Sequence, residues 1–150
     1  MNLPTIVYIY VSCGPGEPMQ SVQSIQVIAG QGLEGDRYSQ GEGSWNSGDK
    51  GKRQVTFFNP DLFAGTGFEP IDSRRNFAVR WIETPTLINK IFKLGSARFK
   101  GLKYCTVCDR PDELSGKKGF REKFSERGGV IAEVTRTGVV SIGDQVILVT

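Results

Sequence analysis

The last part of the chain, GVIAEVTRTGVVSIGDQVILV at residues 129–149, consists of short apolar runs separated by turn residues. Valine and isoleucine recur in these runs, and β-branched side chains favour strands. The runs are interrupted at Thr137-Gly138 and at Gly143-Asp144, which are residue types that turns prefer. The stretch therefore predicts two or three consecutive strands.

Earlier segments show the same strand pattern. Residues 5–11 (TIVYIYV) are rich in β-branched and aromatic side chains. Residues 21–29 (SVQSIQVIA) alternate apolar and polar side chains with one slip, which predicts a strand with a bulge. Further strands are predicted at residues 53–58, 76–82 and 97–105. With nineteen glycines between short apolar runs, this pattern favours a mostly β architecture.

Short helices are expected between some of these strands. Asn59 suits a helix N-cap and Pro60 suits the first helical position, so a short helix should begin there. Other short helices are expected at residues 84–91, 109–114 and 119–127. No internal repeat or domain boundary is evident, so the chain is expected to form a single domain.

Composition fits one globular domain over residues 1–150, with 38% hydrophobic and 23% charged residues. The net charge of +3 suits a small anionic ligand as well as a nucleic acid, and it decides nothing by itself. The apolar stretch at residues 6–11 is too short to cross a membrane and does not resemble a signal peptide. Three cysteines, an odd number, argue against a disulfide framework and favour a cytoplasmic setting.

Two of these cysteines, Cys105 and Cys108, stand in the segment KYCTVCDR at the end of a predicted strand. A structural zinc site needs about four ligands, but the chain has no histidine and only Cys13 as a further thiol. A redox pair of the thioredoxin type normally begins a helix. Two interpretations remain: cysteines buried at a strand end, or a thiolate that neighbouring cations such as Lys103 and Arg110 favour. A thiolate can bind a transition metal or carry persulfide sulfur.

Two other segments combine charge with turn residues. Arg74 and Arg75 precede Asn76 and a predicted strand. They could form a solvated edge, but guanidinium groups also bind phosphate with two parallel hydrogen bonds. Asp36 and Arg37 lie between glycines at the start of a long glycine-rich stretch, where they could be a plain surface ion pair or part of a binding turn.

Together these segments resemble a MOSC domain, which is named for the C-terminal part of molybdenum cofactor sulfurases. The resemblance covers nearly the whole chain and rests on the order of six motifs. They are GLEGDRY at 32–38, RQVT at 53–56, RRNF at 74–77, CTVC at 105–108, RGGV at 127–130 and VSIGDQV at 140–146.

The resemblance implies a β-barrel-like fold and binding of a molybdenum–pterin cofactor, or handling of sulfur destined for it. Cys108 matches the cysteine that ligates molybdenum in the catalytic relatives, which include the mitochondrial amidoxime reducing component. The equivalent cysteine of the sulfurases is proposed to carry persulfide. Arg74 and Asn76 match an Arg-x-Asn pattern near the cofactor, and Asp36-Arg37 match the glycine-rich turn. Our hypothesis is that Cys108 binds molybdenum while Arg37, Arg74 and Arg75 hold the pterin phosphate.

The function that this resemblance implies is an oxidoreductase of N-hydroxylated compounds, with Cys108 as catalytic residue and metal ligand. A separate redox partner would supply electrons, because no ferredoxin-like cysteine set is present. The alternative is a carrier that holds persulfide sulfur or the cofactor and delivers it to a molybdenum enzyme. A third reading is a non-catalytic binding domain. We expect no pyridoxal phosphate site, because no desulfurase domain is evident, and neither nucleic acid nor membrane as a partner.

Overall fold

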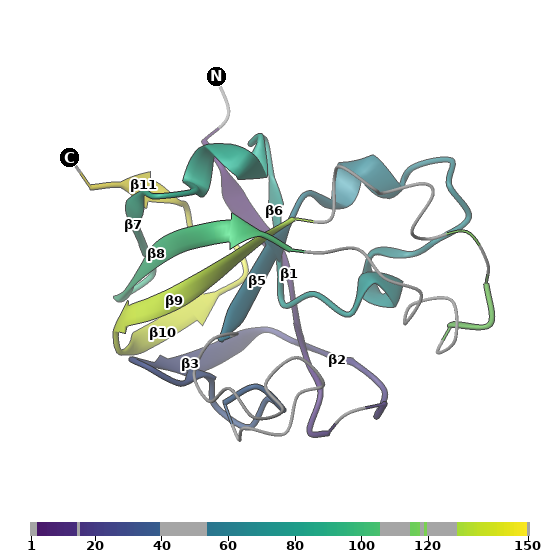
Figure 1. Cartoon of the computed structure of the whole chain (residues 1–150), viewed down its shortest axis with the longest axis horizontal. Coiled ribbons are helices and arrows are strands. Elements are labelled where there is room, and N and C mark those ends of the chain that lie inside the picture. The colour runs from purple at the N-terminus through teal and green to yellow at the C-terminus, as the bar shows by residue number, and fades with distance from the viewer. Residues whose placement is uncertain are drawn as a thin grey trace.

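The computed structural model describes residues 3–14, 16–39, 54–105, 115–117, 119 and 129–149. The described strands form a curled sheet of eight strands in the order β11-β7-β8-β9-β5-β6-β1-β2, and a sheet of three strands in the order β10-β3-β4 (Figure 1). The predicted mostly β, barrel-like fold with short helices is confirmed. Among the described residues, no helix is long and apolar enough to cross a membrane.

The strands of the large sheet are β1 (Thr5–Val11), β2 (Gln20–Val22), β5 (Val55–Phe58), β6 (Phe77–Arg80), β7 (Ile91–Leu94), β8 (Ala97–Tyr104), β9 (Val130–Arg136) and β11 (Ile147–Leu148). Those of the small sheet are β3 (Ser24–Ile28), β4 (Gly32–Leu33) and β10 (Gly138–Ser141). Neighbouring strands pair antiparallel, apart from the parallel pair β5 and β6. Three short 3-10 helices, η1 (Pro60–Phe63), η2 (Pro70–Ser73) and η3 (Thr84–Leu87), connect the described strands.

The segment predicted as one strand at residues 21–29 forms two. β2 pairs with β1 in the large sheet, whereas β3 pairs with β10 in the small sheet. Gln23 lies between them, and its carbonyl accepts a hydrogen bond from the Ile142 backbone N–H (2.9 Å). The slip in the side-chain alternation therefore marks the point where the chain leaves one sheet and enters the other.

The helix predicted at residues 84–91 is wrong beyond its first turn. Helix η3 ends at Leu87, and Asn89 then adopts a left-handed conformation with φ +63° that redirects the chain. Strand β7 follows, with Phe92 and Leu94 buried and Ile91 exposed, as a strand with one face on the core requires. The short helix predicted at Asn59-Pro60 is confirmed as η1. The helices predicted at 109–114 and 119–127 lie outside the described residues, apart from Gly119.

Aromatic side chains fill the centre of the large sheet. The ring of Phe57 lies 5.2 Å from that of Phe77, 5.4 Å from that of Phe92 and 5.5 Å from that of Phe99. All four are fully buried. They come from β5, β6, β7 and β8. The cluster therefore packs β6, which follows the arginine segment (Arg74 to Asn76), against β8, which precedes Cys105.

Candidate functional site

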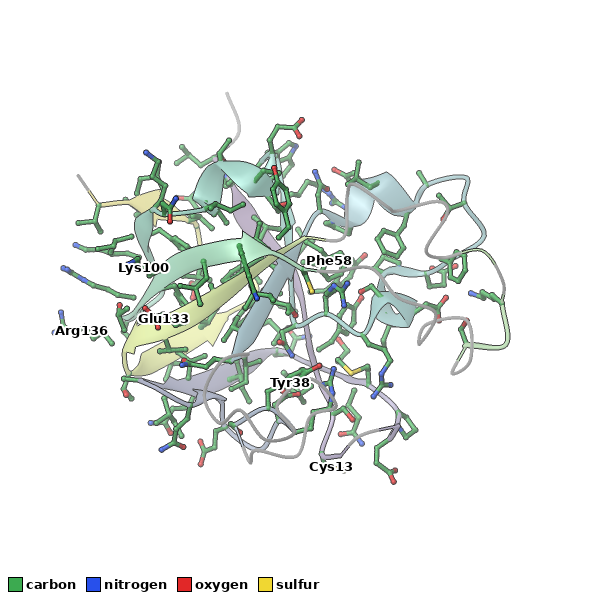
Figure 2. All side chains as sticks on the ribbon, viewed as in Figure 1. Cys13, Tyr38, Phe58, Lys100, Glu133 and Arg136 are labelled. Carbon is green, nitrogen blue, oxygen red and sulfur yellow. The ribbon has the colours of Figure 1, made fainter. Side chains whose placement is uncertain are left out.

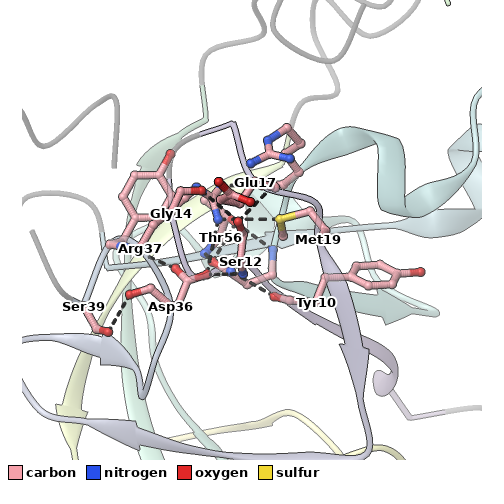
Figure 3. Close-up of polar contacts among 12 residues, drawn as sticks. Tyr10, Ser12, Gly14, Glu17, Met19, Asp36, Arg37, Ser39 and Thr56 are labelled. Atoms are coloured by element: carbon pink, nitrogen blue, oxygen red, sulfur yellow. Dashed lines mark hydrogen bonds and ion pairs between the residues drawn. The ribbon is translucent and has the colours of Figure 1, made fainter. Parts of the chain in front are cut away.

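A buried carboxylate, Asp36, lies where the chain leaves β4. The Ser12 backbone N–H donates to its Oδ1 (3.0 Å) and the Tyr38 backbone N–H donates to its Oδ2 (3.2 Å). The Arg37 guanidinium is its ion-pair partner, with Nη1 3.2 Å from Oδ1 (Figure 3). Asp36 is 0% exposed, so the local ion pair considered from the sequence is a buried one.

Burial raises the pKa of the Asp36 carboxyl above its usual range, because the charged form loses its hydration. The positive charge of Arg37 opposes this rise, as do hydrogen bonds from backbone N–H groups. The carboxylate therefore depends on Arg37 for its charge, and removal of either group leaves the other in an unfavourable environment.

Arg37 connects this carboxylate to the predicted phosphate-binding segment. Its Nη2 donates to the Arg74 carbonyl oxygen (3.1 Å). Its Nη1 lies 3.6 Å from the Met19 sulfur (Figure 3). Its guanidinium also packs over the Tyr38 ring, 4.4 Å from the ring centroid. Its backbone N–H donates to the Ser12 carbonyl (2.7 Å). Arg37 is only 4% exposed, so it acts as a buried link between two loops.

Arg74 ends helix η2 in a left-handed conformation, with φ 57° and ψ 28°. A residue other than glycine is unusual there and costs about 1 kcal/mol or more. The Arg74 backbone N–H donates to the Ile71 carbonyl (3.2 Å), and Arg37 holds its carbonyl. These contacts fix a strained turn that determines where the Arg74 side chain begins.

Arg74 is one of the residues that line a cavity of about 180 Å³. Its described lining residues are Pro18, Met19, Ile71, Asp72, Arg74 and Ser115. The Asp72 carboxylate of η2 forms an ion pair with Lys117, with Oδ2 2.6 Å from Nζ. This pair connects η2 to the chain segment that contains Ser115 and Lys117. The cavity thus lies between the β1–β2 turn, the arginine segment and the part of the chain that follows Cys108 in the sequence.

Arg75 and Asn76 point into the protein. Arg75 is 6% exposed, and its Nη1 lies 3.5 Å from the Ser73 carbonyl oxygen. Asn76 is 0% exposed, and its Oδ1 accepts from the Thr56 backbone N–H and hydroxyl (both 3.1 Å). Its Nδ2 donates to the Tyr10 carbonyl (3.1 Å). The Asn76 amide therefore joins β1, β5 and β6.

The predicted metal ligand, Cys108, lies outside the described residues. Cys105 is buried at 3% exposure after β8, and its backbone N–H donates to the Gly129 carbonyl (2.9 Å). Cys13 is exposed in the turn between β1 and β2. Within the described residues, no three or more Cys, Asp or Glu side chains converge as a metal site would require.

A family model described as MOSC domain matches residues 55–147. The chain belongs to the MOSC domain family. The matched range contains Arg74, Arg75, Asn76 and Cys108, whereas Asp36 and Arg37 precede it. The family is generally related to the molybdenum cofactor. No curated protein matches this MOSC chain in a sequence search.

Solved structures share the fold of this MOSC chain. The YUAD protein from Bacillus subtilis is 15% identical with a TM-score of 0.77, covering 96% of this chain and 94% of that one. YiiM from Geobacillus stearothermophilus is 15% identical with a TM-score of 0.72, covering 98% of this chain and 75% of that one. YiiM from Escherichia coli is 15% identical with a TM-score of 0.69, covering 97% of this chain and 70% of that one. At this identity the likeness shows the fold alone.

Sequence reasoning missed the residues that assemble this site. Ser12, Met19 and Asp72 contact the predicted residues or line the cavity, yet none belongs to a motif. A local signal existed only for Asp72, because an acidic residue three positions after Glu69 is typical of a helix start. Its Oδ2 does accept from the Glu69 backbone N–H (2.8 Å).

Proposed function

We propose that this MOSC protein is a cytoplasmic oxidoreductase that binds a molybdenum–pterin cofactor, with Cys108 as the molybdenum ligand. It would reduce N-hydroxylated compounds with electrons from a separate protein. The observation that carries the proposal is the cavity beside Arg74, which a buried ion pair positions and whose wall includes Ser115 from the segment after Cys108. The family match across residues 55–147 supports the choice of cofactor.

The residues around the cavity fit part of such a cofactor. An arginine in the lining of a largely apolar cavity suits a phosphate group, because a guanidinium offers parallel donors and a permanent charge. The metal of this cofactor is already held by sulfur, so it asks the protein for one soft ligand, which a thiolate provides. When bound, the cofactor would supply the two-electron chemistry. The chain would supply the phosphate contact and the thiolate.

The predicted site residues would have different roles. Arg74 would contact the phosphate, since it is a lining residue of the cavity. Asp36 and Arg37 would position Arg74 through the hydrogen bond to its carbonyl. Asn76 would fix the strand that follows, because both ends of its amide bind β1 and β5. Arg75 would extend the positive charge of the segment from a buried position.

Reduction of an N-hydroxylated amidine by a chemical electron donor tests this proposal without a protein partner. Protein from a host that makes the cofactor is supplied with reduced viologen dye, and dye oxidation is followed optically. The wild type should turn over, Cys108→Ser should be inactive, and Cys13→Ser should keep its activity. A wild type that contains cofactor but does not turn over would refute the enzyme. Persulfide on Cys108 in that protein would favour the carrier instead.

A further inference from the structure

The outer face of strands β7, β8 and β9 carries a row of positive charges. Lys93 of β7 is directly opposite Arg98 of β8, and Arg98 is opposite Arg136 of β9. In the next row, Lys100 is opposite Glu133. We call these five residues the basic face. Figure 2 shows Lys100, Glu133 and Arg136 on one side of the molecule, away from Tyr38 and Cys13.

This arrangement is unfavourable for folding. Like charges directly opposite each other on neighbouring strands repel and destabilise the pair. Among the residues that the structure describes, Lys93, Arg98 and Arg136 form no ion pair. Arg98 is half-buried while Lys93 and Arg136 are exposed, so the three charges face solvent. No acidic side chain among the described residues pairs with these three charges, and we take the row as a candidate contact surface for a partner.

Aliphatic side chains border the basic face. Ile147 of β11 is opposite Lys93 and is 55% exposed, while Ile91 of β7 is opposite Lys100 and is 44% exposed. Interfaces between proteins combine exposed apolar side chains with charged ones in this way. The face therefore offers both an apolar contact and a complementary charge to a partner.

We propose that the basic face docks an acidic surface of a partner protein. Charge complementarity across an interface speeds association and fixes orientation, and a row of guanidinium and ammonium groups selects carboxylates. A nucleic acid fits less well, because the two rows carry no aromatic ring for a base to stack on and include the carboxylate of Glu133. The carboxylate of Glu133 would also repel an anionic lipid surface, so such a surface fits less well too. This surface needs no bound cofactor, so the inference stands apart from the proposed function.

A titration of the isotope-labelled protein with poly-L-glutamate, followed by NMR amide shifts, tests this docking. At low salt, amide signals of β7, β8 and β9 should shift, and the shifts should vanish at about 0.3 M salt because screening weakens exposed charge contacts. Arg98→Gln should weaken binding about two- to five-fold. The matched control is Arg80→Gln, which removes one charge at the end of β6 and should change binding by less than about two-fold.

A triple variant with Lys93, Arg98 and Arg136 each changed to Gln should weaken binding by about 20-fold or more. Its melting temperature should not fall and should rise by about 1–3 °C, because the repulsion between opposite strands is removed. Poly-L-glutamate binding that the triple variant leaves unchanged would overturn the proposal. So would tighter binding of an oligothymidylate or of phosphatidylserine vesicles that depends on the same three residues.

Discussion

Replacement of Asp36 by Asn tests how the candidate site is held together. The change keeps the size of the side chain but removes its charge and one of its acceptor oxygens. Asp36 now accepts hydrogen bonds from the backbone N–H groups of Ser12 and Tyr38 and from Arg37. The new NH₂ group is a donor and would face at least one of these donors. Arg37, only 4% exposed, would keep its charge without the carboxylate.

Removing one partner of a buried ion pair typically costs about 3–5 kcal/mol. For a chain of this length that predicts a fall in melting temperature of about 6–20 °C. Urea unfolding of the wild type and Asp36→Asn measures the free energy of unfolding directly. The matched control is Glu34→Gln, which removes an exposed carboxylate two residues earlier and should change stability by less than about 0.5 kcal/mol.

Asp36→Asn should also affect the turn that carries Arg74. Because Arg37 holds the Arg74 carbonyl, loss of its partner should also weaken the turn that carries Arg74. Asp36→Asn should therefore retain less cofactor than Glu34→Gln at a temperature where both are folded. An unfolding free energy within about 1 kcal/mol of the wild type would refute the buried pair as the main support of the site.

Three other substitutions probe the same account. Burial raises the pKa of Asp36 in the folded protein above its value in the unfolded chain. The stability that Asp36 contributes is therefore present below the unfolded pKa and is lost as pH rises through the folded pKa. Arg37→Met should raise that pKa further, and urea unfolding should show a larger loss at about pH 7 than at about pH 4; equal losses would contradict this. Arg74→Gly should relieve the strain of a left-handed backbone, so the free energy of unfolding should stay the same or rise by up to about 1 kcal/mol. The same variant should retain less cofactor, and an unchanged cofactor content would show that Arg74 does not bind it. Gly129→Ala should lower the free energy of unfolding by more than about 3 kcal/mol, because its new Cβ would clash with the Phe57 backbone. Gly67→Ala is the control, with a similar φ but open space around the new Cβ, and should cost about 1 kcal/mol. Equal costs would contradict the close packing of the chain before β9.

Much of the fold could be predicted because local pattern and long-range pairing agree. The strand at residues 5–11 is recognisable from its side chains alone and forms β1 with the same bounds. The slip in the alternation near Gln23 predicted only a bulge, because a bulge and a change of sheet leave the same local pattern; the pairing of β2 with β1 and of β3 with β10 decides between them. Strand β7 is stabilised by its pairing with β8. A segment of four residues gives no local sequence signal of such a pairing.

The candidate site was less predictable because its key property is burial. The adjacent residues Asp36 and Arg37 read equally well as a surface pair, which would contribute little. Their burial depends on Ser12 and Arg74, which lie 24 and 37 residues away in sequence from their respective partners. Likewise, the Asn76 amide looks available in the sequence, but long-range contacts with two other strands occupy it.

Molybdenum and pterin content, measured on protein purified from a cofactor-competent host, tests the central claim most directly. The wild type, Cys108→Ser and Cys13→Ser are purified in parallel, with circular dichroism to confirm folding. We predict near-stoichiometric molybdenum in the wild type and Cys13→Ser, and its loss in Cys108→Ser. Molybdenum in folded Cys108→Ser at the wild-type level would contradict the assignment of Cys108 as the metal ligand.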